Sequence, residues 1–180
     1  TTDIDGTVTV GTDDTGYDVK FFGNTAGVYA LWDTSEDKLV IRGPEGTGTA
    51  SPGVLRLETA ETTVVDADQL GRIEFIAPAE AGGTDAVLVA ASIWAEADDT
   101  FAADNNACEL VFATAASEAA AEKMRLTSDG KLGIGIATPA ATLDVRGTVT
   151  VGVDGSGQDL TLFGAAANEK VFWDASECTL

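Results

Sequence analysis

The stretch TVTVG occurs twice in the chain, at Thr7–Gly11 and again at Thr148–Gly152. Laying residues 1–39 over residues 142–180, a shift of 141 without a gap, gives 19 identities in 39 positions. The matched positions include glycines, aspartates and the aromatic pair Trp32 and Trp173. Self-similarity at a fixed period is typical of repeat proteins. The repeat therefore has to be explained before any other feature of the sequence.

Both ends of the chain lie inside the repeated phrase. Leu180 aligns with Leu39, after which the first copy continues through Val40–Gly43. This pattern favours a window of one unit plus the start of the next, taken from a longer array. The alternative is a protein whose two ends are homologous to each other.

The first copy is predicted to form a β-meander. Turn sequences separate short runs of β-branched and aromatic residues about every ten residues, which is the pattern of strands joined by tight turns. The expected strands are Thr7–Val10, Tyr17–Phe22, Val28–Trp32 and Lys38–Arg42. Such a short meander buries too little apolar area to be stable alone. Phe22, Trp32 and Leu39 must therefore pack on another block or on identical chains.

A second block of expected strands follows a Gly- and Pro-rich connector. The strands are predicted at Val54–Glu58, Leu70–Ile76, Ala86–Ala95, Glu109–Thr114 and Lys123–Thr127. The segments GRIEFIA and ELVFAT alternate between apolar and polar residues, as strands of a sheet with one buried face do. Ser117–Arg125 resembles a helix but is too short to be stable, so one helical turn or a loop is expected there. Asp129-Gly130 predicts a tight hairpin turn into a return strand at Leu132–Gly135.

Composition excludes several partner classes. Ten Lys and Arg against 30 Asp and Glu give a net charge of −20. So acidic a chain repels nucleic-acid phosphates and anionic membrane surfaces. No apolar run is long enough to span a bilayer. Cys108 and Cys178 are two unrelated cysteines and do not form a disulfide framework, so free thiols are expected.

The sequence singles out no catalytic centre. Histidine is absent, which removes Ser–His and Cys–His nucleophile machinery and histidine metal sites from these residues. Gly133–Pro139 resembles a dinucleotide loop only superficially, because Thr138 replaces the third glycine and no helix is expected after it. Carboxylates are plentiful, yet none stands out as an acid or a nucleophile. We therefore expect no enzyme and no cofactor.

The strongest polar pattern is a repeated acidic turn of the form D-[DG]-[TS]-G-x-D. Its carboxylates suit Ca²⁺, which prefers several oxygen ligands. An Asx-capped hairpin turn is the competing interpretation and is favoured here, because the consecutive copies of a calcium repeat are absent. The candidate calcium ligands are Asp13, Asp14, Asp18, Asp154 and Asp159.

Ser128–Val151, SDGKLGIGIATPAATLDVRGTVTV, resembles a phrase found in bacteriophage tail fibre and related virion proteins. Leu70–Gly135 looks like the globular module that precedes this phrase, and Asp18–Gly43 is similar to the short strand repeats of the same proteins. Ile136 departs from the phrase, which usually has Thr after GIG. The resemblance implies an all-β, elongated, homotrimeric fibre in which strand meanders alternate with small antiparallel β-sandwich-like knobs.

The expected organisation has five parts: a meander fibre repeat at 1–43, a linker at 44–53, an antiparallel β knob at 54–131, a connector strand and turn at 132–141, and a truncated second meander at 142–180. The expected function is that of a structural repeat unit in a virion fibre or extracellular appendage, partnered by further copies of itself. A host-glycan or protein-binding adhesin module is the first alternative. A glycan-degrading enzyme of the tail-spike type is the second.

Overall fold

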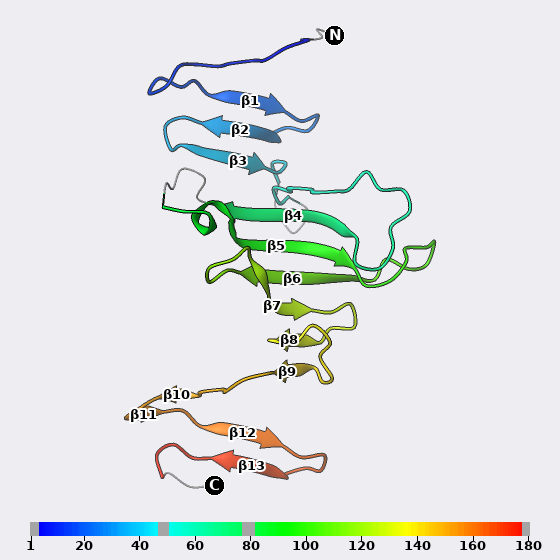
Figure 1. Cartoon of the computed structure of the whole chain (residues 1–180), viewed down its shortest axis with the longest axis vertical. Coiled ribbons are helices and arrows are strands. Elements are labelled where there is room, and N and C mark those ends of the chain that lie inside the picture. The colour runs from blue at the N-terminus through cyan, green and yellow to red at the C-terminus, as the bar shows by residue number, and fades with distance from the viewer. Residues whose placement is uncertain (1–3, 47–50, 77–81, 178–180) are drawn as a thin grey trace. The chain divides into compact units, whose positions relative to one another are not determined.

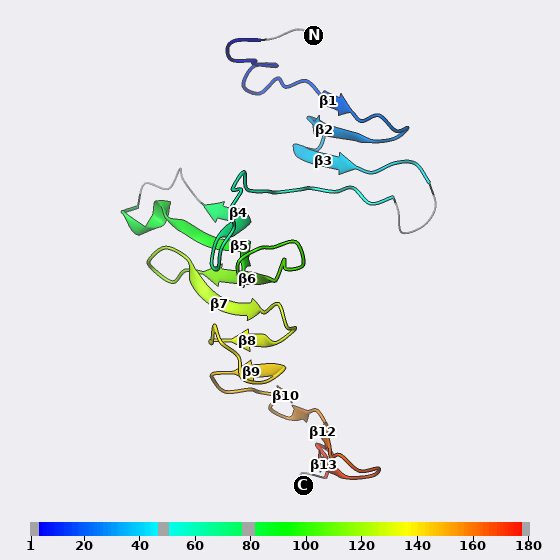
Figure 2. The same cartoon turned by 90° about the vertical axis from the view of Figure 1, so that its right-hand side faces the viewer.

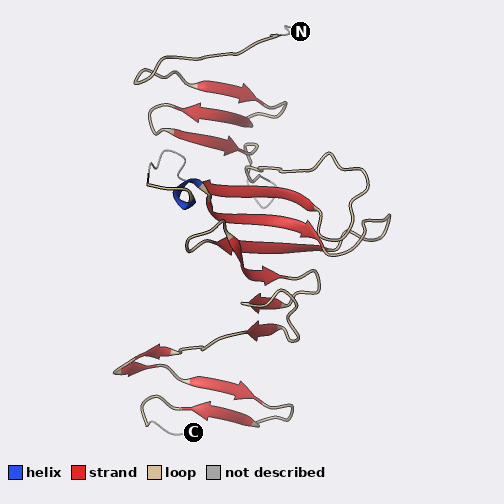
Figure 3. Cartoon of the chain, in the orientation of Figure 1, coloured by secondary structure: helices blue, strands red, loops and turns tan. Residues whose placement is uncertain are grey.

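The structure, a computed structural model, describes residues 4–46, 51–76 and 82–177. The chain divides into two units, Thr1–Leu57 and Glu58–Leu180. The described residues are all-β, as expected: they form strands and one short 3₁₀ turn at Asp85–Val87, and they contain no α-helix (Figure 3).

The first unit contains a three-stranded antiparallel meander. Its strands are β1 (Val19–Phe22), β2 (Tyr29–Asp33) and β3 (Lys38–Arg42), hydrogen-bonded in that order (Figure 1). Gly27 has a φ of 83° in the β1–β2 turn, a conformation that glycine adopts without strain. These strands confirm three of the four expected in the first copy. The fourth, at Thr7–Val10, is wrong, because those residues carry no strand pairing.

The second copy folds locally like the first. Strands β12 (Leu160–Phe163) and β13 (Lys170–Trp173) pair in the register of β1 and β2, since Leu160 faces Trp173 as Val19 faces Trp32. The preceding turn is also shared. Strands β10 (Gly152–Val153) and β11 (Ser156–Gly157) match the bridge between Thr12 and Thr15. The homologous sequences therefore build the same hairpins.

The second unit also contains a six-stranded sheet. Strands β4 to β9 follow one another in chain order within a single layer (Figures 1 and 2). All neighbours are antiparallel except β8 and β9, which are parallel. Gly130, with a φ of 81°, makes the predicted hairpin turn between β7 and β8. The strands are β4 (Gln69–Ile76), β5 (Val89–Ala97), β6 (Cys108–Thr114), β7 (Ala121–Leu126), β8 (Leu132–Ile134) and β9 (Leu143–Val145).

The structure of this block corrects three expectations. The expected sandwich-like knob is a single sheet in the part of the chain that the structure describes, because every strand of the block pairs into the same layer. No strand forms at Val54–Glu58. The sheet also runs past residue 131, since β8 and β9 extend it. Of the two readings of Ser117–Arg125, the loop is correct: Ala121 already begins β7, and no helical turn precedes it.

Candidate functional site

The meander sheet has one face that is entirely apolar. Side chains alternate between faces along a strand, and the pairing places Trp32 between Val19 and Leu39, and Ala30 between Phe21 and Ile41. We call these six residues the apolar face of the meander. Phe21 is 71% exposed and Leu39 61% exposed, so large hydrophobic side chains stand in solvent when the chain is alone.

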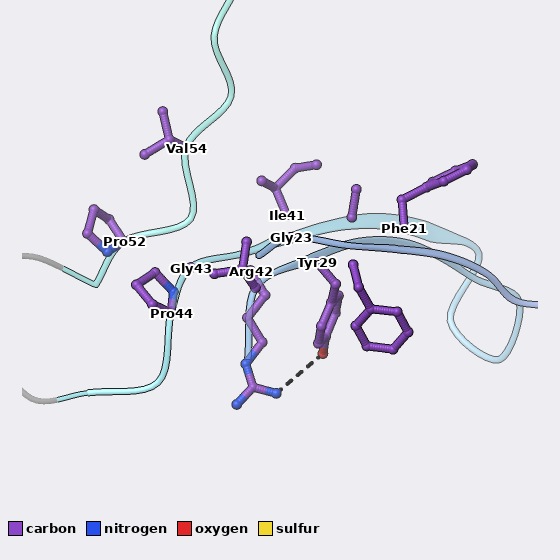
Figure 4. A pocket seen from close by; sticks show the side chains of 12 residues that line it. Phe21, Gly23, Tyr29, Ile41, Arg42, Gly43, Pro44, Pro52 and Val54 are labelled. Atoms are coloured by element: carbon purple, nitrogen blue, oxygen red, sulfur yellow. Dashed lines mark hydrogen bonds between the residues drawn. The ribbon is translucent and has the colours of Figure 1, made fainter. Parts of the chain in front are cut away.

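The opposite face of the meander is mixed in character. Lys20 Nζ lies 4.5 Å from the centre of the Tyr29 ring, and the Arg42 guanidinium lies 5.5 Å from it. Arg42 also donates a 3.5 Å hydrogen bond to the Tyr29 hydroxyl. Figure 4 shows Tyr29 and Arg42 on one side of the strands and Phe21 with Ile41 on the other. The two faces therefore differ sharply in polarity.

The second copy repeats this asymmetry. Leu160 and Leu162 of β12 share a face with Val171 and Trp173 of β13, while the other face carries Thr161, Phe163, Lys170 and Phe172. Leu162 and Val171 are each 57% exposed. The apolar face occurs at equivalent positions in both copies, and among the positions described in both, Trp32 and Trp173 are identical residues.

The six-stranded sheet also has an apolar face, built from two continuous cross-strand rows. Both rows cross all six strands, as the pairing of neighbouring strands shows. The first row is Ile73, Ile93, Phe112, Met124, Ile134 and Val145. The second row is Gly71, Ala95, Leu110, Leu126, Leu132 and Leu143. Ile73, Leu110, Leu126, Ile134 and Leu143 of these rows are exposed. We call the two rows the apolar rows of the sheet.

The other face of the six-stranded sheet is covered by its own side chains. Arg72 of β4 lies 4.9 Å from the Trp94 ring and donates a 3.0 Å hydrogen bond to the buried hydroxyl of Ser92. Val111, next in the same cross-strand row, is fully buried. Arg125 follows it and contacts three glutamates. Long charged side chains therefore close this face without a second layer.

The five predicted calcium ligands lie in turns or directly beside them, and they do not come together as a metal site. The Asp18 carboxylate accepts hydrogen bonds of 3.0 and 2.9 Å from the amide and hydroxyl of Thr34. Asp159 accepts the equivalent 3.0 Å bond from the amide of Ala175. Asp13 and Asp14 lie inside the Thr12–Thr15 turn, and Asp154 lies in the β10–β11 turn. Within the described residues, no group of three acidic, Cys or His side chains is placed to hold a metal ion.

The structure describes one of the two cysteines. Cys108 of β6 is a half-buried free thiol, and burial raises its pKa above the ordinary value, with further contributions from Glu96 and Asp98. A raised pKa keeps the thiol protonated and so weakens it as a nucleophile. Cys178 lies outside the described residues.

Comparison with protein-family models and with curated protein sequences finds no match. Within residues 4–46, 51–76 and 82–177, the search for a helix able to cross a membrane is negative. The exposed apolar faces are therefore the features on which a functional argument can be built.

Proposed function

We propose that the chain is a structural repeat unit of an extended virion or extracellular fibre and that it assembles as a homotrimer. The observation that carries this proposal is the uncovered apolar surface: the apolar face of the meander, its equivalent in the second copy and the apolar rows of the sheet. Contiguous exposed apolar patches of this kind mark interaction surfaces in soluble proteins.

The exposed area supports the need for partners. The chain exposes 13608 Å² for a mass of 18.4 kDa. A compact protein of this mass exposes roughly 8,200 Å², and two separate compact units of one third and two thirds of the mass expose roughly 9,700 Å². The chain exceeds the two-unit value by roughly 4,000 Å². This excess is larger than the roughly 800 Å² that each partner buries in a standard interface.

The sparse core points the same way. Among the described residues, the buried apolar side chains are Leu31, Ala97, Val111, Ala113 and Pro139, and of these only Leu31 is large. Because burying apolar area is the main favourable term in folding, so small a core leaves the stability of the chain dependent on further contacts. Identical chains offer the same apolar surface to each other, and closed rotational symmetry lets each copy cover its neighbour.

The fibre proposal further rests on the resemblance of Ser128–Val151 to virion fibre proteins and on the recurrence of the hairpins at a period of 141 residues. In such a fibre the repeats set length, and mutual covering of the apolar faces gives stiffness. The net charge of −20 keeps a long polymer soluble through mutual repulsion. Further copies of the same chain are the partners in this proposal.

Electron microscopy of fused copies tests the fibre function. Two and three copies of the 141-residue period are joined in frame, and the particles are imaged. The proposal predicts particles of constant width whose length grows by an equal step with each added copy. Particles that stay compact, or that form independent beads on a flexible string, would contradict a length-setting role.

A further inference from the structure

Arg125 lies at the centre of a nearly buried group of three carboxylates, which we call the Arg125 cluster. The guanidinium binds the Glu122 carboxylate through two hydrogen bonds of 2.9 and 2.6 Å. It also pairs with Glu96 at 3.0 Å and contacts Glu109. Glu96 accepts a further hydrogen bond from the Trp94 indole. The cluster thus joins three neighbouring strands, β5, β6 and β7.

The charges of the cluster do not balance. Its side chains are only 14% (Arg125), 12% (Glu96), 7% (Glu109) and 24% (Glu122) exposed. Three ionised carboxylates around one guanidinium leave two excess negative charges in a poorly solvated place. Glu96 and Glu109 are also directly opposed across β5 and β6, where like charges destabilise a sheet. Desolvation favours the neutral form of a carboxyl group under these conditions.

The surrounding charged groups do not supply the missing positive charge. Arg72 pairs with Glu74 of its own strand at 2.7 Å, and Lys131 pairs with Asp129 at 2.7 Å. Asp98, beyond the end of β5, accepts a hydrogen bond from Ser128 and adds another negative charge beside Glu109. Exposed Lys123 of β7 lines a shallow hollow with Glu122 and offsets at most that one charge. The Cys108 thiol, also near Glu96, is neutral when protonated.

We propose that the Arg125 cluster is a proton-binding clamp: it takes up one proton from solvent as pH falls from neutral to mildly acidic and thereby tightens the contact between β5, β6 and β7. The inference does not depend on the fibre function. Burial, and secondarily the charge of Glu96, raises the pKa of Glu122 above the ordinary value, so this carboxyl binds a proton more readily than an ordinary glutamate does. A carboxyl with a raised pKa in the folded state stabilises that state below the unfolded pKa, and this contribution is lost as pH rises through the folded pKa.

Titration of the wild-type chain tests the clamp directly. The carboxyl carbons of the glutamates are followed by NMR from about pH 7.5 to about pH 3.5, a range that brackets the ordinary Glu pKa of about 4.3. The proposal predicts that one carboxyl of the cluster titrates above that value. Three cluster carboxyls that all titrate at or below the ordinary Glu pKa would overturn the proposal.

Chemical denaturation supplies an independent readout through a matched pair of variants. Glu122→Gln and Glu118→Gln each remove one negative charge from the same region of the chain, but only the first removes it from the cluster. The slope of the unfolding midpoint between about pH 7.5 and about pH 5 should flatten in Glu122→Gln and match wild type in Glu118→Gln. Equal slopes in all three proteins would refute the clamp, whatever the absolute stability of each variant.

Discussion

At the scale of single residues, the two copies show which positions their turns require. Gly27 and Asn168 occupy the same turn position with φ of 83° and 71°, and Asp14 and Gly155 share another with 63° and 76°. Asn, Asp and Gly are the residues that tolerate this left-handed region. Asp18 and Asp159 likewise accept the same backbone hydrogen bond. Backbone geometry therefore explains the residues found at the left-handed turn positions, and Asp18 and Asp159 each bind a backbone amide 16 residues further along the chain.

Substitution of Gly133 tests whether the first residue of the GIG phrase must be glycine. It lies buried in β8, opposite Arg125, and an added Cβ would collide with the backbone carbonyl of Ile136. We predict that Gly133→Ala lowers the free energy of unfolding by about 1–3 kcal/mol, the usual range for overpacking. Gly147→Ala is the control, because an added Cβ meets no atom within 4 Å there. Equal stability of the two variants, measured by urea denaturation, would contradict the described packing of β8.

At the scale of elements, the sequence predicted strands well and layers poorly. The meander strands and the β7–β8 hairpin could be predicted because turn residues and β-branched residues mark them locally. The expected sandwich-like knob was wrong because the alternation of apolar and polar residues shows only that a strand has an apolar face. It does not show whether a second sheet covers that face. The parallel pairing of β8 with β9 was missed because it depends on how residues 135–142 connect the two strands, and that connection carries no local pairing signal.

The Arg125 cluster could not be predicted from the sequence either, for a related reason. Glu96, Glu109 and Glu122 stand on three different strands, and each alone reads as an exposed charge of an alternating pattern. Only the register of β5, β6 and β7 brings them to one guanidinium. A charged residue within a strongly apolar strand, such as Glu109 in CELVFAT, is the signal that could have drawn attention to the site.

Phe21 and Phe22 form a natural matched pair for the apolar face of the meander. They are adjacent on β1 and similarly exposed, at 71% and 77%, but they lie on opposite faces. We predict that Phe21→Asp weakens self-association at least tenfold, because it places a charge in an apolar interface, whereas Phe22→Asp leaves it nearly unchanged. Analytical ultracentrifugation of both variants measures the effect. Equal weakening by both substitutions would mean that the apolar face of the meander is not the contact surface.

At the scale of the whole molecule, a single chain leaves its apolar faces uncovered. The chain exposes 13608 Å², and the buried apolar core of its described part has five residues. In the proposed assembly, neighbouring chains cover much of this exposed surface. Neither the exposed area nor the core could be foreseen from composition, since a 44% hydrophobic content suits an ordinary globular domain equally well. The chain differs from such a domain because its hydrophobic residues lie on single faces of one-layered sheets.

The central claim is that identical chains cover these faces, and molar mass in solution tests it most directly. Light scattering coupled to size-exclusion chromatography should give three times the 18.4 kDa of one chain, with the mass unchanged on dilution to low micromolar concentration. A mass of two chains would retain mutual covering but contradict threefold assembly. A mass of one chain at every concentration would contradict the account itself, because the apolar faces would then stay in water.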